Sequence, residues 1–139
     1  MEAFAAIYLG TLSAGVTLAF LILLQFVVVD VSLIRARHVP GMPVTGGHES
    51  FLFRAVRAYG NTTENLGLFL LLIGCALLLG TDPRWTAIAA WTFVAGRAGH
   101  MLCYYADWRT LRSVAFGIGA LAVLGLFVLS VMALCRLLA

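Results

Sequence analysis

Long apolar stretches dominate the chain and set its expected elements. Residues 3–29 carry no charged side chain, and residues 113–135 are again free of charge. Two further apolar stretches lie between them, each interrupted by a few polar positions. A helix that crosses a membrane needs about 20 predominantly apolar residues. We therefore predict four transmembrane helices, over residues 3–34, 50–79, 83–108 and 112–136.

Turn-forming residues separate the predicted helices. Residues 36–49 are rich in proline and glycine and are predicted to form a loop. Gly80 suits the end of a helix, whereas Asp82 and Pro83 suit the cap and first turn of the next one. Short connections favour antiparallel neighbours. The predicted fold is an all-α membrane protein, a single domain over residues 1–139 that forms a four-helix antiparallel bundle.

Composition supports a lipid environment. Of 139 residues, 63% are hydrophobic and only 11% are charged, whereas soluble domains have about 45–50% and 25%. A soluble domain of this size has too little interior to bury so much apolar surface, and disorder is excluded. The basic residues are scattered, so no nucleic-acid partner is expected. The three cysteines, Cys75, Cys103 and Cys135, form no CxxC pair, so we expect no metal site and interpret them as small buried apolar residues.

The distribution of arginines predicts the orientation in the membrane. The first and third connections and their flanks carry most of them: Arg35, Arg37, Arg54, Arg57, Arg109 and Arg112. The opposite side has only Arg84 and Arg136. By the positive-inside rule, the first and third connections face the cytoplasm and both termini lie on the other side. The short chain and its exclusive use of arginine as the basic residue suggest a bacterial inner membrane.

Two of the predicted helices each carry a row of polar side chains on one face. The members are three or four residues apart, which places them on the same side of a helix. The rows are Arg57, Asn61 and Glu64 on the second helix, and Arg97, His100 and Tyr104 on the third. Ionisable side chains within a membrane span usually mark a substrate pathway. We interpret the rows as walls of a polar site suited to a zwitterionic ligand with several carboxylates, such as a small peptide.

Glu64 and Arg97 are predicted to pair. Measured along their helices from the turn at residues 80–83, they lie about 22 Å and about 20 Å deep. Each alone would cost roughly 2.5–3.5 kcal/mol in the hydrocarbon. Such a pair also fits a purely structural link between helices. Because four short helices hardly enclose a peptide, we expect the site to lie between subunits.

These motifs resemble those of a known family. Arg57-Ala-Tyr-Gly-Asn61-Thr-Thr-Glu64 resembles the Arg-x-x-x-Asn-x-x-Glu signature of the MAPEG family, membrane-associated proteins in eicosanoid and glutathione metabolism. Residues 96–104, followed by Arg109 and Arg112, resemble the microsomal prostaglandin E synthase and microsomal glutathione transferase branch. The resemblance covers essentially the whole chain. It implies a homotrimer that binds glutathione, as co-substrate, between neighbouring subunits.

The resemblance also implies residue roles. Arg112 would stabilise the glutathione thiolate, and Ser113 would help to activate the thiol. The glutathione-binding positions would be Arg35, Arg57, Asn61, Glu64, Arg97, His100, Tyr104 and Arg109. The predicted function is thiolate attack on a lipophilic electrophile from the membrane, as a transferase or peroxidase, without a metal.

Two alternatives remain open on the sequence. The first is a lipid- or glutathione-binding member of the same fold without catalysis. Phe116 stands where the prostaglandin branch often has tyrosine, so the identity of the electrophile stays open. The second is a small four-span transporter. The first span argues against this interpretation, because it is free of charge until Asp30. Haem is not expected, since His38 and His48 lie in a loop.

Overall fold

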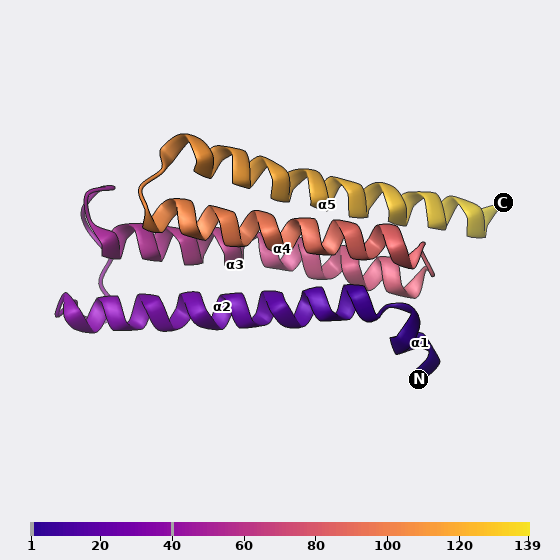
Figure 1. The fold of residues 1–139 in the computed structure, drawn as a ribbon, viewed down its shortest axis with the longest axis horizontal. Helices are drawn as coiled ribbons and strands as arrows, with labels where there is room; N and C mark the ends of the chain where they lie inside the picture. The colour runs from indigo at the N-terminus through magenta and orange to yellow at the C-terminus, as the bar shows by residue number, and fades with distance from the viewer. Residues whose placement is uncertain (1, 40) are drawn as a thin grey trace.

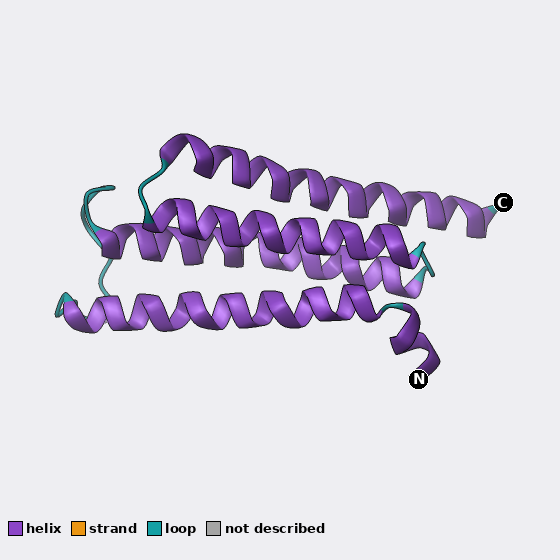
Figure 2. Ribbon diagram, viewed as in Figure 1, coloured by secondary structure: helices purple, strands orange, loops and turns teal. Residues whose placement is uncertain are grey.

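Four long antiparallel helices form the molecule. The computed structural model describes residues 2–39 and 41–139. Its helices are α1 (Glu2–Ile7), α2 (Leu9–Arg35), α3 (Phe51–Leu78), α4 (Pro83–Tyr105) and α5 (Arg109–Leu138) (Figure 1). The described residues contain helices and loops but no strand (Figure 2). The prediction of an all-α fold is confirmed, and residues 36–49 form the expected loop apart from the undescribed position 40.

Helix α4 occupies the centre of the bundle. It contacts α2, α3 and α5, and most of its packing is against α5. Helices α2, α3 and α5 are long and apolar enough to cross a membrane. Helix α4 has 23 residues and is less apolar, because it carries the polar row from Arg97 to Tyr104. Its position among the other three helices keeps that row away from the outer surface.

The turn between α3 and α4 has the predicted chemistry. Gly80 adopts a positive φ of 63°, a conformation that glycine tolerates at a helix end. The side chain of Asp82 accepts hydrogen bonds from the backbone N–H groups of Arg84 (2.9 Å) and Trp85 (3.1 Å). Pro83 occupies the first turn of α4. These features end one helix and begin the next within a few residues.

The first predicted span, residues 3–34, is divided into two helices. The break falls at Tyr8, whose φ and ψ are −101° and 20°. Tyr8 is 4% exposed, and its hydroxyl donates a 2.6 Å hydrogen bond to the backbone carbonyl of Thr81. A buried tyrosine hydroxyl needs such a partner. The apolar pattern does not reveal this break because the partner lies in a distant turn.

Close packing of small and aromatic side chains holds the core together. Phe69 and Phe93 stack with ring centroids 4.2 Å apart. Helices α4 and α5 approach closely at Gly96 and Gly119, where a Cβ on Gly96 would lie 2.8 Å from the Gly119 nitrogen. Small residues allow such close approach between membrane helices.

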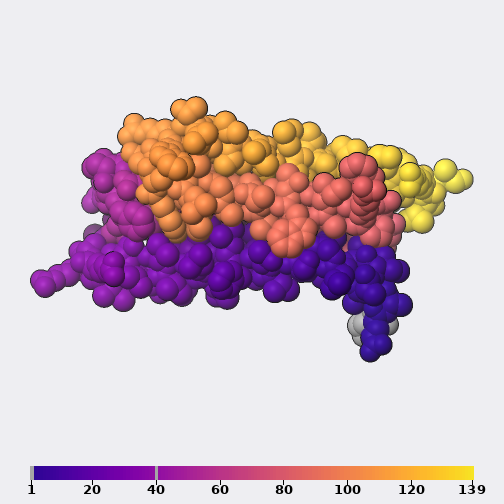
Figure 3. Space-filling view, in the orientation of Figure 1, coloured from indigo at the N-terminus to yellow at the C-terminus, as the bar shows by residue number. Residues whose placement is uncertain are grey.

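The outer surface is apolar and elongated. Large hydrophobic side chains such as Phe20, Leu71 and Leu121 are exposed along the long helices. Figure 3 shows the elongated body, with the N-terminal segment projecting at one end. Both termini lie at that end, whereas the loops that precede α3 and α5 lie at the opposite end (Figure 1). The predicted site residues closest to those two loops therefore share one end of the bundle.

Candidate functional site

Arg97 joins the two polar rows. Its side chain is 1% exposed, and its Nη1 donates a 2.7 Å hydrogen bond to Oδ1 of Asn61 on α3. Nη2 lies 3.5 Å from the carbonyl oxygen of Phe116. The guanidinium carbon is 5.4 Å from the ring centroid of Phe93 and 5.2 Å from that of Phe116. Arg97 thus links α3, α4 and α5, and its Nε has no hydrogen-bond partner among the described residues.

Gly119 provides the space for this guanidinium. A Cβ at Gly119 would lie 2.7 Å from Nη2 and 3.1 Å from Nε of Arg97. Because Gly119 has no side chain, the long Arg97 side chain can enter the interface between α4 and α5. The site depends on a glycine that carries no chemistry of its own.

The predicted ion pair between Glu64 and Arg97 is wrong. Glu64 is exposed and forms no ion pair or side-chain hydrogen bond within residues 2–39 and 41–139. Each helical residue advances by about 100° around the axis. Glu64 therefore lies about 60° from Asn61, on the side away from the buried Thr62. Asn61 faces Arg97, whereas Glu64 is turned toward the outside of the chain.

His100 and Tyr104 continue the row from Arg97 along α4. They are 3% and 8% exposed, and their rings meet edge to face at a centroid distance of 5.0 Å. The His100 ring also lies 6.1 Å from that of Phe116. Nδ1 of His100 is buried and has no hydrogen-bond partner among the described residues. Like Nε of Arg97, Nδ1 of His100 is a buried nitrogen that remains available for a hydrogen bond.

Arg112 reaches the same row from α5. Its guanidinium carbon is 4.5 Å from the ring centroid of Tyr104, in cation–π geometry, and the residue is half-buried. Ser113 is exposed, and its hydroxyl points to the carbonyl of Arg109 at 3.5 Å. Of the two residues predicted to be catalytic, Arg112 therefore contacts the row, and Ser113 lies beside it.

The predicted binding residues fall into two groups. The structure brings together Asn61, Arg97, His100 and Tyr104 with Arg112. A second group is exposed, and it comprises Arg35, Arg57, Glu64 and Arg109. Within the described part of the chain, only Arg109 of this second group forms an ion pair, with Asp107 at 3.6 Å. Within the described residues, no side-chain hydrogen bond or ion pair joins the exposed group to the first group.

Three residues near Arg112 were not predicted as part of the site. His48 stacks on Tyr104 with centroids 6.1 Å apart, and its Nδ1 is 3.4 Å from Nη1 of Arg112. Asp107 adopts a positive φ of 56° in the loop before α5. Arg54 donates to the His48 carbonyl and lies 3.5 Å from the carbonyl of Tyr105. Asp107 stands next to the Arg109–Arg112 segment in the sequence, and its charge there was a signal, whereas His48 and Arg54 come close to this segment only in the folded chain.

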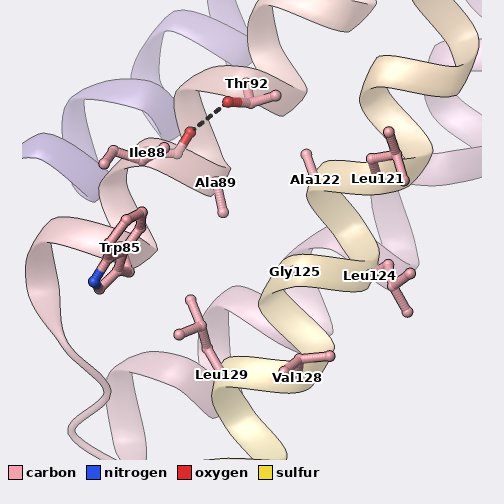
Figure 4. Close-up of a pocket in the computed structure, with 10 residues that line it drawn as sticks. All are labelled: Trp85, Ile88, Ala89, Thr92, Leu121, Ala122, Leu124, Gly125, Val128 and Leu129. Atoms are coloured by element: carbon pink, nitrogen blue, oxygen red, sulfur yellow. Dashed lines mark hydrogen bonds between the residues drawn. The ribbon is translucent and has the colours of Figure 1, made fainter.

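A separate groove lies between α4 and α5. It measures about 540 Å³, and its lining is almost entirely apolar. Figure 4 shows Trp85 and Ala89 of α4 across from Ala122 and Leu129 of α5. It contains none of the predicted site residues, so it is distinct from the polar row.

Comparison with known proteins identifies the family. A model of the MAPEG family matches residues 11–132. The chain belongs to the MAPEG family. The family has a membrane helical bundle, which confirms the predicted fold class, and it includes glutathione transferases and related proteins. No curated protein matches the chain. The matched part of this MAPEG protein contains both polar rows, Arg112 and Ser113.

Proposed function

We propose that this MAPEG protein is a glutathione-dependent membrane transferase or peroxidase that acts on lipophilic electrophiles. The observation that carries the proposal is the half-buried guanidinium of Arg112, held against Tyr104 at the end of the row that begins at Arg97. Such a fixed cation suits an anion that develops or resides beside it. Family membership supports glutathione as the source of that anion. We place the protein nearest to the microsomal prostaglandin E synthase and glutathione transferase branch.

The exposed polar residues suit the charged ends of glutathione. The tripeptide carries two carboxylates and one ammonium group. Arginines bind carboxylates through paired hydrogen bonds, which assigns Arg35, Arg57 and Arg109 to the carboxylates. Glu64 is then the counter-ion for the ammonium group. Asn61 and the row on α4 form the adjoining wall.

The outward position of Arg57 and Glu64 supports a site shared between copies of the chain. Both are exposed within a long membrane-spanning helix. Charged side chains that face lipid are costly, roughly 2.5–3.5 kcal/mol each at the centre of a span. A neighbouring subunit and a bound zwitterion would remove both groups from lipid. We therefore propose a homotrimer with glutathione between subunits, and an Arg-rich end that faces the cytoplasm of a bacterium.

The proposed chemistry is attack by the glutathione thiolate. A free thiol has a pKa of about 8.5, and each unit by which this pKa is lowered corresponds to about 1.4 kcal/mol. The Arg112 guanidinium favours the thiolate electrostatically, and it does not act as a base because it stays protonated. With an aryl halide, a carbon–sulfur bond forms, halide leaves, and the thiol proton passes to solvent. Ser113 donates a hydrogen bond to sulfur once its hydroxyl turns away from Arg109.

A second candidate function is binding of glutathione or lipid without catalysis. One observation favours it: the Ser113 hydroxyl is directed to a carbonyl of its own helix, not toward Arg112. On this alternative, the row on α4 binds the peptide, but the sulfur lacks its hydroxyl donor.

Two measurements on the purified protein in detergent test the proposal. Calorimetric titration with glutathione reports binding, and the release of halide from a small aryl halide reports conjugation. S-methylglutathione, which has no free thiol, is the matched control: it is expected to bind and to give no product. Binding with turnover supports the enzyme, whereas binding without turnover supports the second candidate. Absence of glutathione binding overturns the enzyme and the glutathione-binding form of the second candidate, and leaves only lipid binding.

A further inference from the structure

His48 connects the loop before α3 to the first turn of α5. Its Nδ1 lies 3.4 Å from Nη1 of Arg112 and 3.9 Å from Oδ1 of Asp107. Its ring packs edge-on against Phe53 at 5.4 Å and nearly parallel to Tyr104, with an interplanar angle of 19°. The side chain is therefore held on two sides while its Nδ1 faces two groups of opposite charge.

The backbone at His48 is also held in place. The guanidinium of Arg54 on α3 donates to the His48 carbonyl and reaches the carbonyl of Tyr105 at the end of α4. Glu49, the next residue, accepts a 2.8 Å hydrogen bond from the backbone N–H of Gly47. These contacts fix the loop against α3 and α4. The distance from His48 to Arg112 is therefore set by the fold as well as by the two side chains.

A single nitrogen atom serves two incompatible partners. A guanidinium only donates hydrogen bonds, so Arg112 needs a lone pair on Nδ1, which exists when the imidazole is neutral with its proton on Nε2. A carboxylate only accepts, so Asp107 needs a proton on Nδ1. Oδ1 of Asp107 is buried and has no hydrogen-bond partner among the described residues. The protonation state of Nδ1 thus selects Arg112 or Asp107.

The charges around His48 oppose one another. Several titratable or charged groups surround His48. They are its chain neighbour Glu49, Arg54 on α3, Tyr104 on α4, Asp107 in the loop after α4, and Arg112 on α5, with Arg109 on α5 lying beyond Asp107. A proton on the ring turns its contact with Arg112 into like-charge repulsion and its contact with Asp107 into an ion pair. Imidazole groups make this change between about pH 5 and pH 8.

We propose that His48 is the positioning residue for Arg112. The neutral ring accepts a hydrogen bond from Nη1 and holds the guanidinium over Tyr104, whereas the protonated ring turns to Asp107 and releases Arg112. Only one proton moves, from solvent to Nδ1, and no covalent bond is made or broken. The inference rests on the proposed function, because it concerns the same cation that stabilises the thiolate.

Two variants separate the hydrogen bond from the ring. His48→Asn places an amide oxygen where Nδ1 stands, so it accepts from Arg112 at every pH. His48→Phe keeps the stacking on Tyr104 but removes the acceptor. His38→Asn changes the other histidine of the same loop, which bonds to the Met42 carbonyl, and serves as the matched control. Conjugation of glutathione to an aryl halide is measured between about pH 5 and pH 8.

The expected results differ between the variants. Turnover of the unmodified protein and of His38→Asn falls toward low pH both because the thiolate is protonated and because the contact between His48 and Arg112 is lost, whereas His48→Asn keeps only the decrease due to the thiolate and therefore falls less steeply. His48→Phe lowers kcat about tenfold or more throughout, because the guanidinium is no longer held in place, and it changes the Kd for glutathione by less than about threefold. An acid limb as steep in His48→Asn as in the unmodified protein, or an unchanged kcat in His48→Phe, would overturn the proposal.

A second measurement does not depend on catalysis. Nuclear magnetic resonance of the nitrogen-labelled protein follows the titration of the His48 ring directly. Arg112→Ala removes a neighbouring cation and is expected to raise the midpoint, whereas Asp107→Asn removes an anion and is expected to lower it. Unchanged midpoints in both variants would overturn the proposed exchange of partners. If conjugation fails while these midpoints shift as expected, the proposed function fails but the contact between His48 and Arg112 stands.

Discussion

The two ends of the bundle treat buried polar groups in opposite ways. At the end that contains the α3–α4 turn, the buried hydroxyls form a connected chain. Tyr8 donates to the Thr81 carbonyl at 2.6 Å, Thr81 and Thr86 share a 2.7 Å hydrogen bond, and Thr86 donates to the Asp82 carbonyl at 2.8 Å. These bonds join the break between α1 and α2, the α3–α4 turn and the first turn of α4. They serve the fold, because each polar atom has found a partner within the chain.

At the other end, buried polar atoms are left without hydrogen-bond partners. Within the described residues these include Nε of Arg54 and Arg97, Nδ1 of His100 and Oδ1 of Asp107. An unsatisfied buried polar group costs about 1–3 kcal/mol. At the end that contains the α3–α4 turn, the buried side-chain atom without a hydrogen-bond partner among the described residues is Oγ1 of Thr11. The difference indicates that the end near Arg112 retains polar groups at the expense of stability, as a ligand-binding site does.

The largest expected effect tests whether the two ends differ in function. Arg112→Ala is expected to reduce kcat for conjugation about 100- to 1,000-fold, because a fixed positive charge next to the thiolate is lost. Calorimetry is expected to show a smaller loss of glutathione binding. Arg136→Ala at the opposite end removes the same charge and is the control, with turnover within about twofold of the unmodified protein. Equal losses in kcat and binding would remove Arg112 from the catalytic role.

The next effect concerns the close contact of α4 and α5 beside Arg97. Gly96→Ala places a Cβ 2.8 Å from the backbone of Gly119 and is expected to destabilise the protein by about 1–3 kcal/mol. Gly117→Ala, where a Cβ meets nothing within 4 Å, is the control and is expected to cost nothing. Equilibrium unfolding in mixed micelles gives both values. Similar stability of the two variants would show that the helices do not approach so closely.

A smaller effect distinguishes the partner of Arg97. Arg97→Met and Asn61→Ala are each expected to destabilise, with a coupling free energy of about 1–2 kcal/mol in the double variant, because they share one hydrogen bond. Arg97→Met combined with Glu64→Gln is expected to be additive within about 0.5 kcal/mol. Unfolding of the three single variants and the two double variants measures both cycles. Coupling to Glu64 instead of Asn61 would restore the predicted ion pair.

The smallest effect tests the turn end. Tyr8→Phe removes one hydroxyl and leaves the Thr81 carbonyl without that donor, so it is expected to lower the free energy of unfolding by about 1 kcal/mol. Turnover is expected to stay the same, because the change lies far from Arg112. Unfolding in micelles and the conjugation assay on one sample check the two statements. A loss of activity without a loss of stability would break the contrast between the ends.

Local sequence chemistry predicted much of the fold but little of the site geometry. The turn from Gly80 to Pro83 was predictable because its signals are local: a positive φ, a capping carboxylate and a proline at the start of α4. The break at Tyr8 was not, since it depends on a carbonyl 73 residues away in the sequence. The spacing of Arg57, Asn61 and Glu64 identified one side of α3. It did not show which member of the row faces Arg97, because that depends on the rotation of α3 within the bundle.

The sequence by itself determined that the chain forms long membrane helices, since the backbone groups of an apolar segment in lipid must be satisfied within the helix. It also determined which residues carry charge inside those helices. Only the tertiary structure decided their partners. A change of a few tens of degrees in helix rotation exchanges Asn61 for Glu64, and the path of a loop brings His48 to Arg112. Partner choice follows geometry between elements, which local spacing does not contain.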